Sequence, residues 1–123
     1  MDTKAFWNDV INQNKEKLNT YFNNDALILW PCTNERFTVE EYIRANCEYP
    51  GSWNGEIERL EEHEDEYIVA GHVYSKEETI SCHVVSFIKT ENGKISQMVE
   101  YWADDGDAPE WRKEMNIGKP IYQ

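Results

Sequence analysis

Three ionisable side chains in the C-terminal half of the chain are suited to proton transfer. Glu100 begins the tripeptide Glu100-Tyr101-Trp102, and His72 and His83 lie in two earlier segments rich in Val, Ile, Tyr and Phe. A carboxyl group or an imidazole in an apolar environment can exchange protons with a bound molecule near neutral pH. The residue types therefore indicate general acid–base chemistry, with Glu100, His83 and His72 as the candidate catalytic residues.

Strands are expected to position these three residues. The segments 66–75, 79–88 and 94–103 have the β-branched and aromatic composition typical of strands. Asn92-Gly93, between the last two segments, is a strong signal for a two-residue hairpin turn. Three consecutive antiparallel strands are therefore predicted.

The turn at Asn92-Gly93 also predicts which residues face each other. If Glu91 pairs with Lys94, the register pairs Phe87 with Met98, Val85 with Glu100, and His83 with Trp102. These side chains would share a mostly apolar face that one acid and one imidazole interrupt, as in the wall of a small-molecule pocket. A hairpin at Glu77-Glu78 would likewise place His72 opposite His83.

The same residues could also have purely structural roles. Glu100 could instead face outward or pair with Arg44 or Arg112, and a strand histidine is often a satisfied structural residue. The three histidines show no His-x-x-x-His spacing, so no metal site is expected. No cofactor is expected either.

The N-terminal part of the chain is expected to be mainly helical. Apolar residues from Phe6 to Ile11 follow a helical spacing, and those from Leu18 to Phe22 resume it. The pattern further predicts a turn at 23–25, a strand over 26–30 that ends at Pro31, a helix with a capping box at Thr38 and Glu41, a strand over 56–62 with a helix as its alternative, and a short helix after Pro109. The whole chain, 1–123, is predicted to form a single α+β domain in which N-terminal helices cover a curved antiparallel sheet.

Composition excludes several classes of function. With 12 Lys and Arg against 24 Asp and Glu, the net charge of -12 opposes binding to nucleic acid or to anionic membranes. The same acidity also serves solubility. The three cysteines have no Cys-x-x-Cys spacing, and the first residues carry no pattern of a secretory leader, so a cytoplasmic protein is expected.

The order of elements resembles the nuclear transport factor 2-like superfamily, and in particular its SnoaL-like branch, from Phe6 to about Trp111. The residues that carry the resemblance are Asn92-Gly93-Lys94-Ile95, which opens the last strand, and Glu100-Tyr101-Trp102, which ends it. The resemblance implies a cone-shaped fold in which the sheet curls around a pocket under a helical lid. It also implies a homodimer formed through the outer face of the sheet.

The resemblance carries over to individual residues unevenly. Ketosteroid isomerases have an Asp before a Pro at the end of the first strand as their base, where this chain has Trp30-Pro31. An indole cannot act as that base. SnoaL-like cyclases use an acid near a histidine, and Glu100 with His83 or His72 resembles that pair. Scytalone dehydratases combine paired strand histidines with an acid and tyrosines, and this chain has His72, His83, Glu100 and Tyr42 as a similar set.

Three hypotheses follow from these observations: a protein that binds a small, largely apolar organic ligand without a reaction, a cofactor-free acid–base enzyme, and a protein-interaction module with a filled cone. The residues expected to line a ligand pocket are Trp7, Trp30, Tyr42, Trp53, Val85, Phe87, Met98 and Trp102. The volume of the pocket discriminates the third hypothesis, because bulky side chains that meet one another would leave no room for a ligand.

Overall fold

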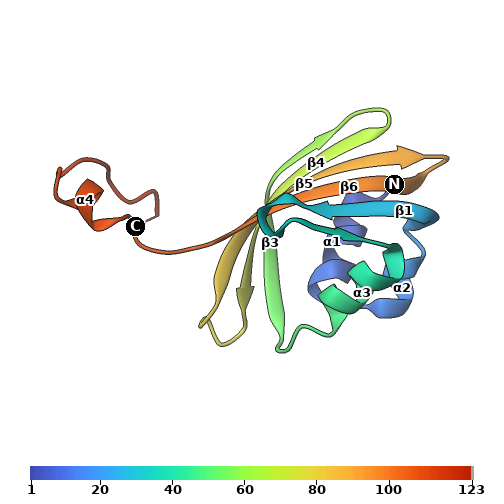
Figure 1. The fold of residues 1–123 in the computed structure, drawn as a ribbon, viewed down its shortest axis with the longest axis horizontal. Coiled ribbons are helices and arrows are strands. Elements are labelled where there is room, and N and C mark those ends of the chain that lie inside the picture. Colours follow the sequence, from blue (N-terminus) through green and yellow to red (C-terminus); the bar gives the residue numbers. More distant parts are fainter. Residues whose placement is uncertain (123) are drawn as a thin grey trace.

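The computed structural model describes residues 1–122, and it shows the N-terminal helices packed on one side of a single curved sheet (Figure 1). The helices are α1 (Thr3–Ile11), α2 (Lys15–Asn19), α3 (Val39–Cys47) and α4 (Glu110–Lys113), with a 3-10 turn at Pro31–Thr33. The strands are β1 (Phe22–Trp30), β2 (Glu35–Phe37), β3 (Trp53–Glu62), β4 (Glu66–Ser75), β5 (Ser81–Glu91) and β6 (Lys94–Asp104).

The six strands form one open sheet in the order β2-β1-β6-β5-β4-β3. The predicted α+β class and the predicted curved sheet are confirmed, and the hairpins β3-β4, β4-β5 and β5-β6 are antiparallel. The pair β1 and β6 differs from the expected plan because it is parallel. The long connection from β1 through α3 and the three hairpins returns the chain to the side of β1 in the same direction.

Local signals in the sequence explain where several elements begin and end. Thr38 and Glu41 form the predicted capping box at the start of α3, each side chain bonding to the other residue's backbone N–H. Pro31 follows the last residue of β1, as expected for a residue without a backbone donor. The turn expected at 23–25 is not formed, because β1 already begins at Phe22 and includes those polar residues.

The face of the sheet toward α1, α2 and α3, called here the inner face, carries the core. Side chains from β4, β5 and β6 alternate between this face and the opposite, outer face, as the period of two requires. Gly71 of β4 is where α1 approaches most closely, since an added Cβ would collide with the ring of Trp7. The missing side chain thus leaves room for the outer edge of the indole ring against β4.

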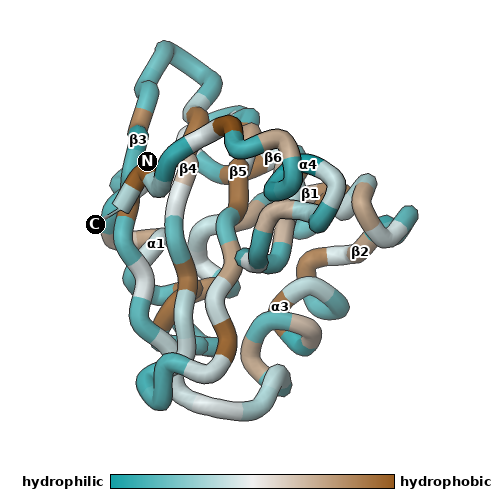
Figure 2. Tube along the Cα trace, turned by 90° about the vertical axis from the view of Figure 1, so that its left-hand side faces the viewer, coloured by the Kyte–Doolittle hydropathy of each residue, from teal (hydrophilic) through white to brown (hydrophobic). Residues whose placement is uncertain are grey.

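After β6 the chain leaves the sheet, and residues 106–122 form an extended segment, called here the arm. Figure 1 shows this segment, with α4, standing away from the body, and Figure 2 shows it in front of the outer face of the sheet. All residues from 103 to 122 are exposed. No helix within the described part of the chain is long and apolar enough to cross a membrane.

Candidate functional site

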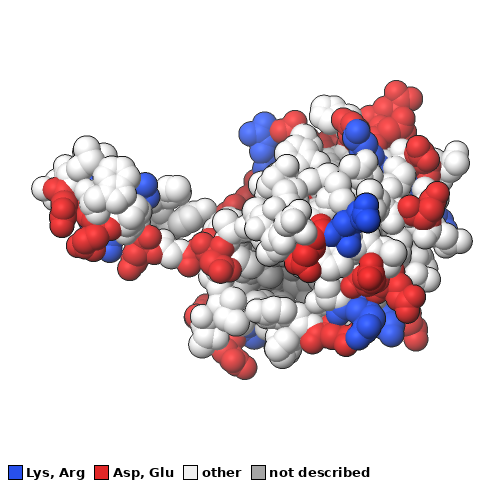
Figure 3. All heavy atoms as spheres, viewed as in Figure 1, with Lys and Arg blue, Asp and Glu red and all other residues white. Residues whose placement is uncertain are grey.

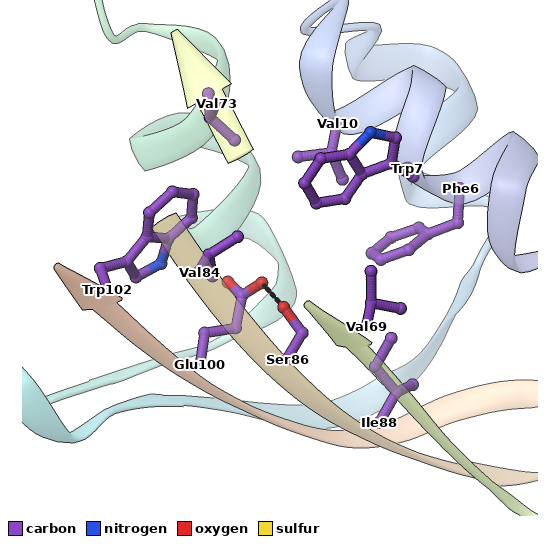
Figure 4. Close-up of a pocket in the computed structure, with 10 residues that line it drawn as sticks. All are labelled: Phe6, Trp7, Val10, Val69, Val73, Val84, Ser86, Ile88, Glu100 and Trp102. Atoms are coloured by element: carbon purple, nitrogen blue, oxygen red, sulfur yellow. Dashed lines mark hydrogen bonds between the residues drawn. The ribbon is translucent and has the colours of Figure 1, made fainter. Parts of the chain in front are cut away.

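Glu100 of β6 lies on the inner face and is sealed from solvent, with 5% of its surface exposed. Its two carboxylate oxygens accept separate hydrogen bonds. The hydroxyl of Ser86 donates to Oε2 at 2.6 Å, and the indole N–H of Trp30 donates to Oε1 at 3.1 Å. Figure 4 shows the carboxylate directed at Ser86, with apolar side chains on the remaining sides.

Burial decides the charge state of this carboxyl group. Desolvation raises the pKa of Glu100 above its ordinary value of 4.5, while the hydrogen bonds from Ser86 and Trp30 and the nearby indole N–H of Trp102 act in the opposite direction. Desolvation outweighs these donors. The Trp102 N–H, although near the carboxylate, makes no hydrogen bond of acceptable geometry.

Aromatic side chains surround the acid. The ring of Trp30 meets Tyr42, Trp102 and Phe37 edge to face, with the centroids of Trp30 and Trp102 6.3 Å apart. Tyr42 of α3 is fully buried, and its pKa is raised well above 10.0 by burial first and then by the nearby charge of Glu100. Trp30, Tyr42 and Trp102, which the sequence suggests as ligand-binding residues, thus lie near the carboxyl group of Glu100.

The hollow beside Glu100 is very small. It lies under α1, and its volume accessible to a water-sized sphere is about 10 Å³. The residues that line it are Phe6, Trp7, Val10, Val69, Val73, Val84, Ser86, Ile88, Glu100 and Trp102. A volume of this size holds about one water molecule and no organic ligand. In the described conformation the cone is closed.

The predicted register of the last hairpin is wrong beyond its turn. Glu91 pairs with Lys94 as expected, but a β-bulge at Ser96 shifts the pairing by one residue. Glu100 therefore pairs with Ser86 instead of Val85. As a one-residue shift moves side chains to the other face, Val85 and Phe87 lie on the outer face, away from the hollow.

His72 and His83 also lie on the outer face. They are paired across β4 and β5 as predicted, and their rings are stacked with centroids 4.7 Å apart. The sheet separates them from the carboxyl group of Glu100, so the structure does not bring the three candidate catalytic residues together. The alternation along β5 places Val84 and Ser86 inward and His83 outward.

The two histidines belong to a polar cluster at the base of the arm. Asp105, the residue after β6, bonds to both Ser81 and the Nδ1 atom of His83. His72 Nε2 lies 2.7 Å from the hydroxyl of Ser81, and His83 Nε2 lies 3.5 Å from a carboxylate oxygen of Glu58. These contacts are with solvent-accessible side chains, which suits a structural role.

Charge pairing sets the pKa values in this cluster. The hydrogen bond to Asp105 raises the pKa of His83 above 6.5, and desolvation acts in the opposite direction. Partial desolvation acts to raise the pKa of Asp105, but the hydrogen bonds from Ser81 and His83 outweigh it and lower the value below 3.8. Both directions favour an ion pair between His83 and Asp105.

The remaining predicted residues are distributed as follows. Trp7 lines the hollow, Met98 is fully buried on the same side of the sheet, and Trp53 is partly buried beside Tyr49 at the start of β3. Ser86 was missed, since a serine within an apolar strand gives no signal until its cross-strand partner is known. Within residues 1–122, no group of His, Cys, Asp or Glu side chains is arranged to hold a metal ion.

Comparisons with known proteins identify the fold. No family model and no curated protein matches the sequence. The structure is similar to a proposed ketosteroid isomerase from Kribbella flavida, with a TM-score of 0.80 and 22% identity over 97% of this chain and 87% of that one. It is also similar to an NTF-2-like protein of unknown function from Burkholderia xenovorans, with a TM-score of 0.76 and 19% identity over 96% of this chain and 91% of that one.

A third similar structure represents the SnoaL-like branch. It is a proposed SnoaL-like polyketide cyclase from Shewanella putrefaciens, with a TM-score of 0.66 and 12% identity over 91% of this chain and 79% of that one. The chain therefore has the nuclear transport factor 2-like cone fold that the sequence resembles. At these identities the similarity shows the fold alone.

Proposed function

We propose that this protein binds a small, largely apolar organic molecule in the cone, in contact with Glu100. The observation that carries this proposal is the burial of one carboxyl group among Trp7, Trp30, Tyr42 and Trp102. A buried acid destabilises a fold unless its hydrogen bonds compensate for the loss of hydration, so an apolar side chain would suit a purely structural core better. Perturbed ionisable groups in concave sites are candidates for function.

The chemistry of the site restricts the ligand. The tryptophan faces suit a compact or flat apolar body, and the carboxyl group suits a hydrogen-bond donor or an activated proton on that body. A buried carboxyl group whose ionised form is already disfavoured gives no attraction for anionic ligands. A neutral ketone, a phenol or an amine of a few heavy atoms fits this description better than a large polycyclic molecule.

Entry of such a ligand requires α1 to move. Phe6, Trp7 and Val10 of α1 form the roof of the hollow. The C-terminal end of α1 is held to α3, where the amide of Asn46 donates to the backbone oxygen of Val10 at 3.1 Å. The other end has a weaker anchor, a 3.4 Å contact from the amino group of Met1 to Tyr67. We therefore expect the N-terminal half of α1 to be the part that opens.

A more specific version of this proposal is that Glu100 acts as an acid–base catalyst, and the raised pKa of its carboxyl group favours this role. A carboxyl group whose pKa is raised toward neutrality is a better proton acceptor than an ordinary one. The pairing of Glu100 with His83 or His72 is not part of this proposal, because the histidines lie on the outer face. Glu100 would exchange the proton with the ligand directly, next to Ser86.

A filled cone that serves only protein interaction is the second candidate. The observation that favours it is the volume of about 10 Å³ beside Glu100. In this case the aromatic residues are a solid core, and Glu100 is held by Ser86 and Trp30 for structural reasons. The two candidates differ in whether the cone accepts any small molecule.

The test is a titration of the full chain with cyclohexanone, phenol and trimethylamine, followed by indole fluorescence and by amide chemical shifts. A ligand site predicts saturable changes at Trp7, Trp102 and Glu100. Glu100→Gln, which preserves shape and removes the charge, should weaken at least one of these probes by tenfold or more. A matched variant on the outer face, His72→Gln, should bind all three probes as the parent does.

The outcome that contradicts the ligand site is equally clear. If none of the three probes changes the signals of the cone at millimolar concentration, the filled-cone candidate stands. If a probe binds equally to the parent and to Glu100→Gln, the cone binds ligands but Glu100 has no part in recognition.

A further inference from the structure

The arm is held to the body of the protein by polar contacts at its two ends. At its base, Asp105 bonds to the side chains of Ser81 and His83, and its backbone N–H donates to the carbonyl oxygen of Ser81 at 3.0 Å. At its tip, the hydroxyl of Tyr122 donates to Oε2 of Glu58 at 3.0 Å. The hydrogen bonds and the ion pair described for the residues between these ends lie within the arm itself. Figure 3 accordingly shows the arm as a separate mass joined to the body by a thin connection.

Both contacts meet at the imidazole ring of His83. Its Nδ1 atom bonds to the carboxylate of Asp105, and its Nε2 atom lies 3.5 Å from Oε1 of Glu58. Glu58 is the extra residue of a β-bulge in β3, and its second oxygen accepts the hydrogen bond from Tyr122. One ring therefore links the base of the arm to the side chain that holds its tip.

The protonation state of His83 decides whether it can hold both carboxylates. An imidazolium ring donates from both nitrogens, whereas a neutral imidazole has one N–H and one lone pair. Since a carboxylate oxygen lies beside each nitrogen, only the charged ring suits both neighbours. In the neutral ring a lone pair would face one of the two carboxylates. The positive charge also offsets the repulsion between Asp105 and Glu58.

The contact with Glu58 is the one expected to fail when the proton leaves. The contact of His83 with Asp105 is the shorter of the two, and Asp105 keeps two further hydrogen bonds to Ser81. Glu58 has no such support, and its side chain is 38% exposed. It can turn toward solvent, and the hydroxyl of Tyr122 then loses its acceptor on the sheet.

We propose that His83 is a pH-dependent latch for the arm: the protonated ring holds Asp105 and Glu58 together and keeps Tyr122 on the sheet, and loss of the proton releases the tip. The base stays attached through Asp105. Release leaves the arm tethered at one end, so the tip can reach a larger part of the protein surface. This latch lies on the outer face and is independent of the proposed ligand site on the inner face.

The sign of the pH dependence follows from His83. The hydrogen bond to Asp105 raises the pKa of His83 above 6.5, and desolvation acts in the opposite direction. The charged ring holds the tip, so the tip should be fixed at about pH 5.5 and should be released as the pH rises through the folded pKa of His83.

The two ends of the arm do not titrate in this range. Despite partial desolvation, its bonds to Ser81 and His83 keep the pKa of Asp105 below 3.8. The hydrogen bond to Glu58 is the main cause that raises the pKa of Tyr122 above 10.0. The other ionisable groups that face this cluster are Glu56 of β3 and His72 and Tyr74 of β4.

The experiment follows the mobility of the tip in the full-length chain as the pH changes. Carbon-13 relaxation of the Cα atom gives an order parameter for Tyr122 without relying on exchangeable amide hydrogens. This order parameter should fall by about 0.2 or more between about pH 5.5 and about pH 9, to below the value of about 0.6 that marks a flexible backbone. The midpoint should coincide with the titration of the His83 ring, followed through its carbon signals in the same sample.

Three full-length variants separate the latch from a general effect of pH. His83→Gln cannot carry the charge, so the tip should be mobile over the whole range. Tyr122→Phe should also have a mobile tip at every pH, although its His83 ring still titrates. His63→Gln, at an exposed histidine outside the cluster, should keep the transition of the parent. Circular dichroism verifies that each variant is folded.

Four results would overturn the latch. The first is an order parameter of Tyr122 that is equal at both ends of the pH range in the parent. The second is a transition that survives in His83→Gln or in Tyr122→Phe. The third is a midpoint that differs from that of the His83 ring, and the fourth is a transition that His63→Gln abolishes. None of these results bears on whether the cone binds a ligand.

Discussion

The two faces of β5 and β6 place similar residues in opposite environments. On the inner face Glu100 is 5% exposed and receives only hydrogen bonds from neutral donors, Ser86 and Trp30. On the outer face Asp105 lies within reach of water and bonds to His83, which can carry a positive charge. The inner carboxyl group has a raised pKa and the outer one a lowered pKa.

This difference shows that hydrogen-bond partners and solvent exposure, more than residue type, determine the pKa of an acidic side chain. A carboxyl group without a cation is pushed toward its protonated form by burial, and one beside an imidazolium is held as an anion. Only four residues separate Glu100 from Asp105 along the chain. The first suits proton exchange with an enclosed molecule, and the second suits anchoring the arm.

The largest expected loss of stability comes from disturbing the packing of α1 on the inner face of the sheet. Gly71→Ala adds a methyl group where the ring of Trp7 lies, with the nearest ring atom 2.3 Å from the added Cβ. We expect the free energy of unfolding to fall by about 1–3 kcal/mol, the usual range for an overpacked core. Urea denaturation measures it.

The matched control for that variant is Gly106→Ala, at the start of the arm. A Cβ there meets no atom within 4 Å. The free energy of unfolding should change by less than about 0.5 kcal/mol, as for ordinary surface substitutions. Equal effects at the two glycines would contradict the close packing of α1 on β4.

The next largest effect concerns the hydrogen bond that the buried carboxylate of Glu100 accepts from Ser86. Ser86→Ala removes the donor at 2.6 Å from the carboxylate. Since hydrogen bonds to charged groups contribute about 1.5–3 kcal/mol, the variant should lose stability in that range at pH 8, where an ionised Glu100 keeps only the hydrogen bond from Trp30. The loss should be smaller at pH 4. Ser52→Ala, at an exposed serine, serves as the control and should show neither change.

The pH dependence of Glu100→Gln tests the raised pKa. Because the pKa of the folded state lies above the ordinary value of 4.5, the folded protein binds the proton more tightly than the unfolded chain. The parent should therefore lose stability relative to Glu100→Gln as pH rises from about 4.5 through the folded pKa, and the difference should then level off. A difference that is flat over pH 4–9 would contradict a buried, perturbed carboxyl group.

The smallest effect concerns the outer face. The pKa of His83 is raised above 6.5 by its bond to Asp105, so its contribution to stability is present below that pH and is lost as pH rises through the folded pKa. Both side chains are about one third exposed, and the contribution should be below about 1 kcal/mol. His83→Gln should abolish this pH-dependent part, whereas His63→Gln, at an exposed histidine, should retain it.

Much of the fold could be predicted because its signals are local. The capping box at Thr38, the turn at Asn92-Gly93 and the pairing of His72 with His83 all follow from short spacings along the chain. The parallel pairing of β1 with β6 could not be predicted in this way, since it joins segments about 70 residues apart. No local pattern records such a contact.

The candidate site was predicted less completely, and one bulge accounts for most of the difference. The extra residue Ser96 reverses which side chains of β5 share a face with Glu100. Val85 and Phe87 were therefore expected in the pocket and lie on the outer face, and Ser86 was overlooked. The serine at the bulge does not distinguish it from an ordinary strand residue, so sequence periodicity alone could not locate the shift.

The central claim is that Glu100 is enclosed in the cone as a perturbed carboxyl group, separate from the histidines of the outer face. The most direct test is a carbon-13 NMR titration of the glutamate side-chain carboxyl groups, in which Glu100→Gln identifies the signal of Glu100. The account predicts a pKa clearly above 4.5 for that signal, unchanged in His83→Gln. A pKa at or below 4.5, or one that moves when His83 is replaced, would contradict it.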